Sequence, residues 1–511
     1  MASRRDELNA YTFAKKRLVA QFLQPSPTGT EEGAPRPLRA VVPGLIIGVV
    51  IMAGFGAWGM FKPQVPKGWD KVEENIIIGS ESTTRYVVLK TGKREQLHPV
   101  LNLASAKLLL DPSKGTKPIK VDEKFLDSGK LPHGATIGIP YAPDRLPDAE
   151  EAGSNKRWAV CERPREDGGA IRKAAFVLSE REAKKVGGSE QLRGGELMYV
   201  QGPDKTLYVV DKRGTRYAIA DDELLLRTVV DRNAKPQRVS SQWLATLHEG
   251  DPINFPTIGG TPAAPANVPG GQLDQDSNRV GMVLKAPAGN GDQYYLVVPG
   301  QVMPVSDFMA KLLLSTRSLL PLNQSGKAKP VSAAAFTPSD SEFGASKNWP
   351  QQTPESVNRA DSVANERDTS CNVLRNVNRK TGRTTLSTWA GEDFPAQLPT
   401  GSTSAYVSPG SGQLFRQVKG SDMDTGGIFL VTDTGLRYAM QGNSDSAEEE
   451  SEIGKKKKSK EEAQQDGNES AQARLGYENV KKPAPIPAVW SQFLPTGPRL
   501  STSSAKQPQG S

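Results

Sequence analysis

Few residues of this 511-residue chain have the types and spacing that chemistry requires. The three histidines, His98, His133 and His248, lack the H-E-x-x-H spacing that places two zinc ligands on one helix face. His98 precedes Pro99 at a predicted helix start, where an ordinary surface role is expected. The sequence therefore predicts no metal site and no catalytic histidine.

Sites for nucleotides and nucleophiles are also missing from the sequence. Glycine–lysine pairs occur at 92–93 and 326–327, but neither belongs to the G-x-x-x-x-G-K-[ST] pattern that cradles phosphates. No G-x-S-x-G elbow occurs, and adjacent carboxylates such as Asp221 and Asp222 are typical of a solvated turn. We therefore predict no catalytic residues, no cofactor and no enzymatic activity.

One long apolar segment, residues 40–61, carries no charge and lies between Arg39 and Lys62. As a helix it would be about 33 Å long, enough for a hydrocarbon core of about 30 Å. It starts too late and is too long for a cleaved secretory signal. We expect a single transmembrane helix with Arg39, Trp58 and Lys62 at the membrane interfaces.

Basic residues in the first 39 positions predict the orientation of that helix. This segment carries seven Lys and Arg against four Asp and Glu, within a total net charge of +8. Basic flanks of a membrane helix tend to stay in the cytoplasm, so the N-terminus is predicted inside and residues 62–511 outside the cytoplasmic membrane. Charges in the outer part are mixed, which argues against a nucleic-acid partner.

The two cysteines, Cys161 and Cys371, both lie on the predicted outer side of the membrane. An even pair in an oxidising compartment favours one disulfide, which would close a loop of about 210 residues and stabilise the fold by about 4 to 5 kcal/mol on the loop-closure model. The alternative is two unrelated buried thiols.

The N-terminal tail predicts a short basic helix. Ser3 and Asp6 have capping-box spacing, Pro25 ends the pattern, and an apolar face contains Leu8, Tyr11, Leu18 and Phe22. The helix either lies on the anionic inner leaflet, in contact with membrane lipid, or docks other cytoplasmic subunits, and the residues favour neither. The candidate docking residues are Arg4, Arg5, Lys15, Lys16 and Arg17.

A strand-turn-strand phrase recurs in the outer part. An aromatic residue, apolar residues and a turn glycine occupy 86–92, 208–214, 295–300 and 429–435. After the first and third copies, segments 98–110 and 303–314 each resemble a short helix entered through proline. The irregular spacing argues against a solenoid and predicts four small modules.

Short predicted strands surround both cysteines, which indicates one central β core built from two chain segments. The predicted fold is a membrane protein with a single transmembrane helix and a β-rich α+β ectodomain, in which four pseudo-repeat modules surround a central β core. Stretches 259–272 and 337–368 have the composition of linkers. The predicted parts are the basic tail 1–39, the helix 40–61, module one 62–130, core part A 131–200, module two 201–262, module three 276–336, core part B 337–425, and module four 426–511 with a disordered charged insertion at 444–470.

With these features in place, the chain resembles the EccB membrane component of type VII (ESX) secretion systems. The resemblance covers nearly the whole length. It depends on the tail from Ser3 to Arg17, the single anchor, and the motifs at 138–144, 158–161 and 494–500. Tyr141 departs from the family phrase, which usually has a small residue there.

This resemblance implies a structural subunit that builds a protein-export channel with EccC, EccD and EccE, close to the mycosin protease, and that is oligomeric within the complex. It also implies four repeat modules around a disulfide-linked core. The family modules are similar to a cell-wall-binding phage lysin, so a peptidoglycan-binding anchor or receptor is the alternative function. ATPase activity has been described for the family and is the third.

Overall fold

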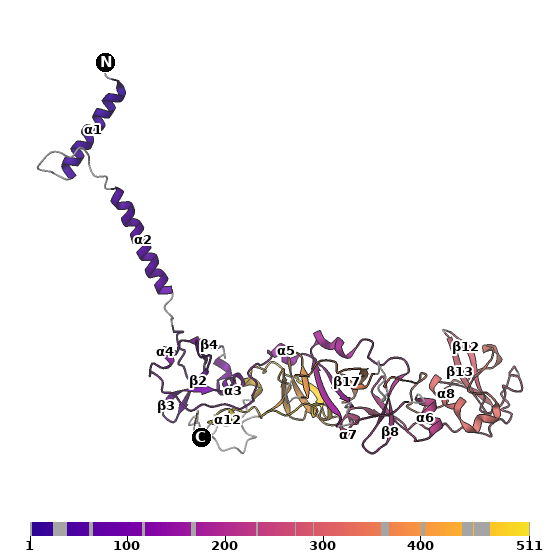
Figure 1. Ribbon diagram of the computed structural model, residues 1–511. Helices are drawn as coiled ribbons and strands as arrows, with labels where there is room; N and C mark the ends of the chain where they lie inside the picture. The colour runs from indigo at the N-terminus through magenta and orange to yellow at the C-terminus, as the bar shows by residue number, and fades with distance from the viewer. Residues whose placement is uncertain are drawn as a thin grey trace. The chain divides into compact units, whose positions relative to one another are not determined.

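The computed structural model describes residues 3–23, 38–60, 65–114, 118–164, 170–230, 234–270, 272–289, 291–358, 367–399, 404–441, 453 and 471–509. It divides into two compact units, residues 1–68 and 69–511, each considered by itself below (Figure 1). Of the predicted insertion 444–470, only Ile453 lies among the described residues.

The first unit contains two helices, α1 (Arg4–Leu23) and α2 (Leu38–Met60). At the start of α1, the Ser3 backbone N–H donates to the Asp6 carboxylate at 3.2 Å, which is one half of the predicted capping box. Within α2, residues 41–59 are long and apolar enough to cross a membrane. The helix begins at Leu38, two residues earlier than predicted, and so includes Arg39.

All four recurring phrases form the predicted β-hairpins. Their turn glycines, Gly92, Gly214, Gly300 and Gly435, have positive φ between 61° and 79°, a conformation that glycine adopts without a steric penalty. The hairpins are β2–β3 (Arg85–Thr91, Arg94–Val100), β8–β9 (Leu207–Asp211, Thr215–Ile219), β13–β14 (Gly291–Val298, Gln301–Val305) and β21–β22 (Ile428–Thr432, Arg437–Met440).

Each hairpin gains two more strands in the same arrangement. An earlier strand pairs antiparallel with the hairpin, and a later strand pairs parallel with that earlier strand. We call these four sheets hairpin sheets one to four. The added strands are β1 (Ile76–Gly79) with β4 (Pro118–Val121), β7 (Glu196–Gln201) with β10 (Gln237–Arg238), β12 (Val283–Ala288) with β15 (Lys329–Pro330), and β20 (Gly412–Val418) with β23 (Ala484–Pro487).

A short helix separates the hairpin from the parallel strand in every hairpin sheet. These helices are α3 (Leu103–Leu109), α6 (Glu223–Val229), α8 (Asp307–Ser315) and α10 (Ala471–Arg474). Asn102, Asp222 and Ser306 cap the first three, each accepting a hydrogen bond from the backbone N–H three residues on. Pro99 and Pro304 lie within β3 and β14, so the predicted helix entry through proline is wrong: the polar cap starts each helix.

A fifth segment runs parallel to the third strand of each hairpin sheet. Residues 133 and 137 pair with β3, β11 (His248–Glu249) pairs with β9, residue 338 pairs with β14, and residues 496 and 500 pair with β22. Sheet two has one further strand, β16 (Glu355–Ser356), which pairs with β7.

The central sheet has the order β18-β17-β5-β6-β19 and joins two distant chain segments, as predicted. Its strands are β5 (Arg157–Arg163), β6 (Arg172–Leu178), β17 (Thr369–Val377), β18 (Thr384–Gly391) and β19 (Ala405–Val407). Strand β17 lies between β5 and β18, so the first segment and the second segment share one continuous ladder.

Two of the predicted boundaries separate strands that belong together. β7 starts five residues before the predicted boundary at 201 yet pairs with β8, and β20 lies before the boundary at 426 yet pairs with β21. The recurring sequence phrase covers only the hairpin, so no sequence pattern marks the first strand of each sheet.

The described parts of the two predicted linkers, 259–270 with 272 and 337–358 with 367–368, contain residues that pack against the fold. Ala266 is buried, and its carbonyl accepts from the Gly300 N–H at 2.7 Å. Trp349 is buried as well, and the buried Asn358 side chain bonds the Tyr199 backbone in both directions. Their composition indicates irregular backbone but not freedom from contact.

Shared apolar cores connect the sheets. One core contains residues of hairpin sheets two and three, including Tyr217 and Leu296. Another contains residues of sheets one and four, including Leu89 and Leu430. A third places Trp158 of the central sheet with residues of sheets two and four. The central sheet therefore packs against the hairpin sheet that follows each of its two chain segments.

Candidate functional site

The three histidines do not form one site: His133 pairs with Leu97 beside His98, whereas His248 lies in β11 of hairpin sheet two. His98 is buried in β3, contrary to the predicted surface role, because Pro99 continues the strand and the imidazole points into the fold. Its Nδ1 lies 2.8 Å from the Ala135 carbonyl, and burial lowers its pKa. His248 Nε2 bonds the Thr384 hydroxyl at 2.7 Å, and His133 lies 3.4 Å from an Asp127 oxygen. Across the described ranges, no group of three or more His, Cys, Asp or Glu could hold a metal.

The remaining chemistry-bearing patterns have structural roles. Gly92 and Gly326 of the two glycine–lysine pairs occupy turns with positive φ. Asp222 accepts from the Leu225 N–H at 2.9 Å and caps α6, which explains one member of the predicted solvated pair.

The predicted disulfide is confirmed. Cys161 of β5 and Cys371 of β17 lie directly opposite each other in the antiparallel ladder, with Cα atoms 4.0 Å apart, and their sulfurs are bonded. Both residues are completely buried in an apolar cluster with Phe176 and Trp389. The bond connects the two chain segments of the central sheet at its middle.

The predicted docking and membrane residues lie in the first unit. Arg4, Arg5, Lys15, Lys16 and Arg17 are exposed on α1. Trp58 is exposed on α2 beside Phe55, with ring centroids 6.2 Å apart. Arg39 belongs to α2, whereas Lys62 falls outside the described residues.

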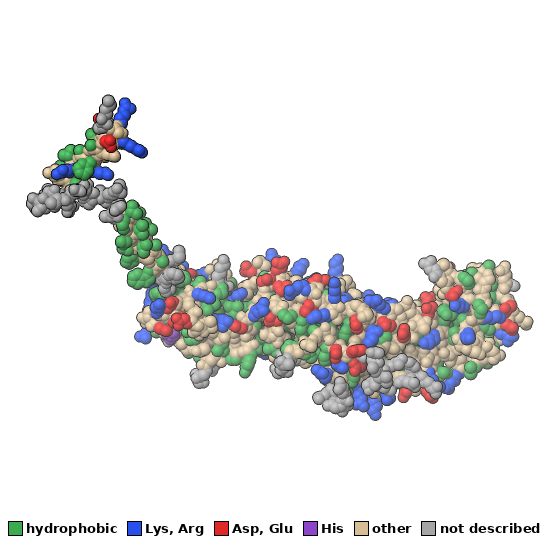
Figure 2. All heavy atoms as spheres, turned by 45° about the horizontal axis from the view of Figure 1, so that its top comes forward, with side chains coloured by type: hydrophobic (Ala, Val, Ile, Leu, Met, Phe, Trp, Pro, Cys, Tyr) green, Lys and Arg blue, Asp and Glu red, His purple; other side chains and the backbone are tan. Residues whose placement is uncertain are grey.

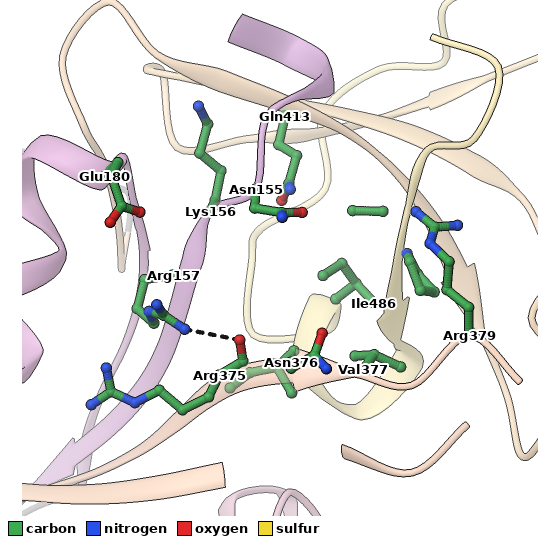
Figure 3. A pocket seen from close by; sticks show the side chains of 13 residues that line it. Asn155, Lys156, Arg157, Glu180, Arg375, Asn376, Val377, Arg379, Gln413 and Ile486 are labelled. Atoms are coloured by element: carbon green, nitrogen blue, oxygen red, sulfur yellow. Dashed lines mark hydrogen bonds between the residues drawn. The ribbon is translucent and has the colours of Figure 1, made fainter. Parts of the chain in front are cut away.

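A cleft of about 370 Å³ lies beside the disulfide-linked strands. It is bounded by β5, β17 and β23 and by the side chains drawn in Figure 3. Four basic residues, Lys156, Arg157, Arg375 and Arg379, and one acidic residue, Glu180, contribute to its wall.

The three arginines of this cleft bond neutral acceptors. Arg157 Nη1 donates to the Arg375 carbonyl at 2.8 Å, and Arg375 Nη2 donates to the Val186 carbonyl at 2.8 Å. Arg379 Nη2 donates to the Lys482 and Pro483 carbonyls at 3.1 Å. Burial, together with the nearby charge of Arg157, lowers the pKa of Arg375 to about 10.

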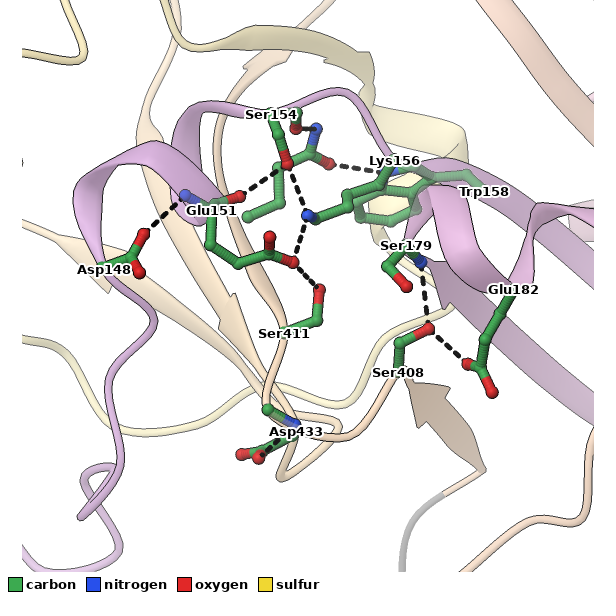
Figure 4. Close-up of polar contacts among 12 residues, drawn as sticks. Asp148, Glu151, Ser154, Lys156, Trp158, Ser179, Glu182, Ser408, Ser411 and Asp433 are labelled. Carbon is green, nitrogen blue, oxygen red and sulfur yellow. Dashed lines mark hydrogen bonds and ion pairs between the residues drawn. The ribbon is translucent and has the colours of Figure 1, made fainter.

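A polar network at the edge of the cleft ties the central sheet to hairpin sheet four (Figure 4). The Lys156 ammonium, 1% exposed, lies 2.6 Å from a Glu151 carboxylate oxygen, which also accepts from the Ser411 hydroxyl at 2.6 Å. The Trp158 indole N–H donates to Gln413 Oε1 at 2.8 Å. The Lys156 bond holds the pKa of Glu151 below its usual value, so this carboxylate is ionised at neutral pH.

Sequence reasoning did not identify the cleft. Its residues come from 155–157, 180, 374–379, 413 and 484–486, and none of these segments carries a motif. The only available signal was the cysteine pair, because the register that opposes Cys161 to Cys371 also opposes Trp158 to Leu374 and so brings Arg157 next to Arg375.

A comparison with protein families matches residues 1–510 to the family described as type VII secretion system ESX-1, transport TM domain B. The chain belongs to this family. The whole described structure, from α1 to the end of hairpin sheet four, therefore falls within one family domain.

Curated relatives carry ESX names. The chain is 28% identical to the ESX-1 secretion system ATPase EccB1 of Mycobacterium tuberculosis over 283 residues, which cover 55% of the chain and 54% of the relative. It thus spans about half the length of these first relatives. A longer match, 23% identical, covers 98% of the chain and 88% of the ESX-3 secretion system ATPase EccB3 from the same organism.

Solved structures share the fold. A chain of an intact ESX-5 inner membrane complex matches with a TM-score of 0.56 and 20% identity, covering 100% of this chain and 96% of that one. An EccB3 dimer from the ESX-3 core complex matches with a TM-score of 0.53 and 21% identity, covering 84% of this chain and 99% of that one.

Proposed function

We propose that this protein is a structural subunit of a type VII secretion complex in the cytoplasmic membrane, where it helps to assemble and stabilise the export channel. The observation that carries the proposal is the family match over residues 1–510. The likeness of the fold to chains of ESX-5 and ESX-3 assemblies supports it. The implied partners are EccC, EccD, EccE, the mycosin protease and further copies of this chain.

The proposed role includes no chemical step, although the relatives are named ATPases. The sequence lacks the glycine-rich phosphate loop, and the two glycine–lysine pairs form ordinary turns. An ectodomain outside the cytoplasmic membrane would also have no access to cytoplasmic nucleotide. Phosphate release from ATP by the purified chain, abolished by one point substitution, would contradict this part of the proposal.

The proposed orientation places α1 in the cytoplasm and residues 69–511 outside. Seven Lys and Arg in the first 39 residues favour it. Cysteine-accessibility labelling provides the test, with single cysteines introduced at Asn9 and Lys327 of a variant whose native cysteines are alanine. Labelling of position 327 alone by an impermeant maleimide on intact cells is the expected result.

We propose docking as the role of α1, in preference to a position on the lipid surface. Lys15 lies four residues after Tyr11 and three before Leu18, so an ammonium group lies in the middle of the exposed apolar face. A charge at that place opposes burial in acyl chains, whereas an apolar groove with one carboxylate accommodates it.

The four hairpin sheets are proposed to be copies of one ancestral module, because all four have the same strand order, helix position and closing segment. Measured from the first strand to the last residue that pairs in parallel with the hairpin, the modules span 76–137, 196–253, 283–338 and 412–500. The central sheet occupies 157–178 and 369–407.

Affinity purification from detergent-solubilised membranes tests the proposed function. We expect the other secretion subunits to copurify with the full chain and to be lost, or strongly reduced, when residues 4–23 are deleted. A second variant, Lys15→Glu, retains the helix, reverses the charge on its apolar face and should also lose the other subunits if α1 docks through that face. Retention of an isolated chain by peptidoglycan without any copurifying subunit would instead favour a cell-wall anchor.

A further inference from the structure

Positive charge exceeds negative charge in the cleft beside the disulfide. The ammonium of Lys156 is already matched by Glu151 at 2.6 Å, outside the cleft lining. Arg157, Arg375 and Arg379 remain, opposed only by the exposed carboxylate of Glu180. Three guanidinium groups beside one carboxylate leave this wall of the protein cationic.

The protein itself does not neutralise these guanidinium groups. Their hydrogen bonds go to carbonyls and neutral side chains, and within the described ranges no carboxylate forms an ion pair with any of the three. Arg157 Nε is buried and, among the described residues, has no hydrogen-bond acceptor. A partly buried cation without a counter-charge is energetically unfavourable, so an anion entering the cleft would be stabilised.

The shape and remaining lining of the cleft suit a small molecule. Its volume of about 370 Å³ falls within the usual range for ligand sites, roughly 300 to 1,000 Å³. Figure 3 shows Arg157 on one side and Arg379 on the other, with the Asn155 and Asn376 amides between them. Ile486 adds an apolar surface at the wall formed by β23.

We propose that this cleft binds a small ligand through an oxyanion, a carboxylate or a phosphate, which Arg157 and Arg379 hold while the two asparagine amides bond its neutral polar body. Arginine suits this task because its planar fork of donors matches both oxyanions. Glu180 disfavours ligands of high negative charge. The inference is independent of the proposed function, since anion binding by this cleft and copurification of other subunits are separate measurements.

Binding is measured by ligand-observed NMR on the full chain in detergent at constant ionic strength. The probes are inorganic phosphate and N-acetylmuramic acid. The neutral control is N-acetylglucosamine, which differs from N-acetylmuramic acid mainly by lacking the lactyl carboxylate. Binding of N-acetylmuramic acid without phosphate identifies a carboxylate ligand, and the reverse identifies a phosphate ligand. Equal binding of N-acetylglucosamine, or no binding of either anion, overturns the proposal.

Variants locate the bound anion. Arg157→Gln is expected to weaken binding by about 10-fold, because one charge-assisted hydrogen-bonding group is lost. Arg379→Gln provides the same reading if the first variant does not fold. Glu180→Gln is expected to strengthen binding about threefold by removing a like charge, a modest surface electrostatic effect.

Arg383→Gln is the control, because this exposed arginine lines a different cleft. The affinity of this variant for the bound anion should equal that of the wild type. Two results would show nonspecific attraction by the basic surface and would overturn the site. One is that Arg383→Gln weakens anion binding as much as Arg157→Gln does. The other is that Glu180→Gln leaves anion binding unchanged.

Discussion

The central sheet meets its two neighbours through glutamates in contrasting environments. Towards hairpin sheet two, Glu162 of β5 is completely buried and accepts from the Ser240 N–H at 2.8 Å and from its hydroxyl. Towards hairpin sheet four, Glu151 is about one-third exposed and lies 2.6 Å from the Lys156 ammonium. We call these contacts the Glu162 junction and the Glu151 junction.

The pKa values of the two glutamates shift in opposite directions. Burial raises the pKa of Glu162, because the nearest cation, Lys173, is 3.9 Å away and does not compensate for lost hydration. The Lys156 and Ser411 hydrogen bonds lower the pKa of Glu151. The same side chain thus serves as a desolvated acceptor at one junction and as a paired ion at the other.

A tryptophan donor supplements each glutamate. The Trp243 indole donates to the Val160 carbonyl at 3.1 Å in the Glu162 junction, and the Trp158 indole donates to Gln413 in the Glu151 junction. Both rings are fully buried. The two junctions therefore each bury a tryptophan ring, and they differ in how the glutamate carboxylate is hydrogen-bonded or paired.

The largest expected effect comes from removing the disulfide between the junctions. Replacing Cys161 and Cys371 by alanine should lower the free energy of unfolding by up to about 5 kcal/mol, because the bond closes a loop with a separation of 210 residues that contains hairpin sheets two and three. Denaturant unfolding of residues 69–511 within the full chain measures this loss. Reduced wild-type protein is the control and should match the variant, whereas a loss below about 1 kcal/mol would contradict the loop-closure account.

The sequence was sufficient for features that depend on local patterns. The four hairpins follow from an aromatic strand and a glycine that can adopt positive φ, and the disulfide follows from the only two cysteines. The apolar run 41–59 identifies the candidate membrane helix by length and composition.

Features that depend on pairing between distant segments could not be predicted from the sequence. The parallel strands β10 and β15 contain only two residues each, too few for any periodicity, and were not recognised. The His98-Pro99 pair predicts a helix start and a surface position for His98, whereas Pro99 lies inside β3, where its carbonyl accepts from the Ile137 N–H. The cleft required β5, β17 and β23 to meet, which no local pattern encodes.

The second-largest effect is expected at the Glu162 junction. Glu162→Ala should reduce the free energy of unfolding by about 2 to 3 kcal/mol, because the Ser240 N–H loses a charged acceptor in a buried place. Thermal or denaturant unfolding measures it. Glu162→Gln retains an acceptor oxygen and serves as the matched control, so an equal loss in both variants would show that the ionised carboxylate matters more than the acceptor.

The pH dependence of the two junctions should have opposite signs. The folded state raises the pKa of Glu162, so near this pKa the folded protein binds more protons than the unfolded chain. The contribution of Glu162 to stability therefore falls as pH rises from 4.5 through the raised folded-state value. For Glu151, whose pKa is lowered, stability is present above 4.5 and lost as pH falls through the folded-state value.

Unfolding free energies of Glu162→Gln and Glu151→Gln between pH 3 and pH 8 separate these contributions. Relative to the wild type, the first variant should gain stability as pH rises, and the second should lose it. Each unit by which a folded-state pKa departs from 4.5 corresponds to about 1.4 kcal/mol of this difference. Parallel curves for both variants would contradict the comparison.

The smallest effect is expected for Ser411→Ala in the Glu151 junction. The serine hydroxyl donates to Glu151 at 2.6 Å, but the carboxylate is partly exposed and water can replace the lost donor. We expect a loss of about 0.5 to 1 kcal/mol. A double-mutant cycle with Glu151→Gln tests whether the hydroxyl acts through the ion pair. A coupling energy near zero would mean that Ser411 stabilises hairpin sheet four independently, and the Glu151 junction would then consist of the Lys156 pair and the Trp158–Gln413 hydrogen bond.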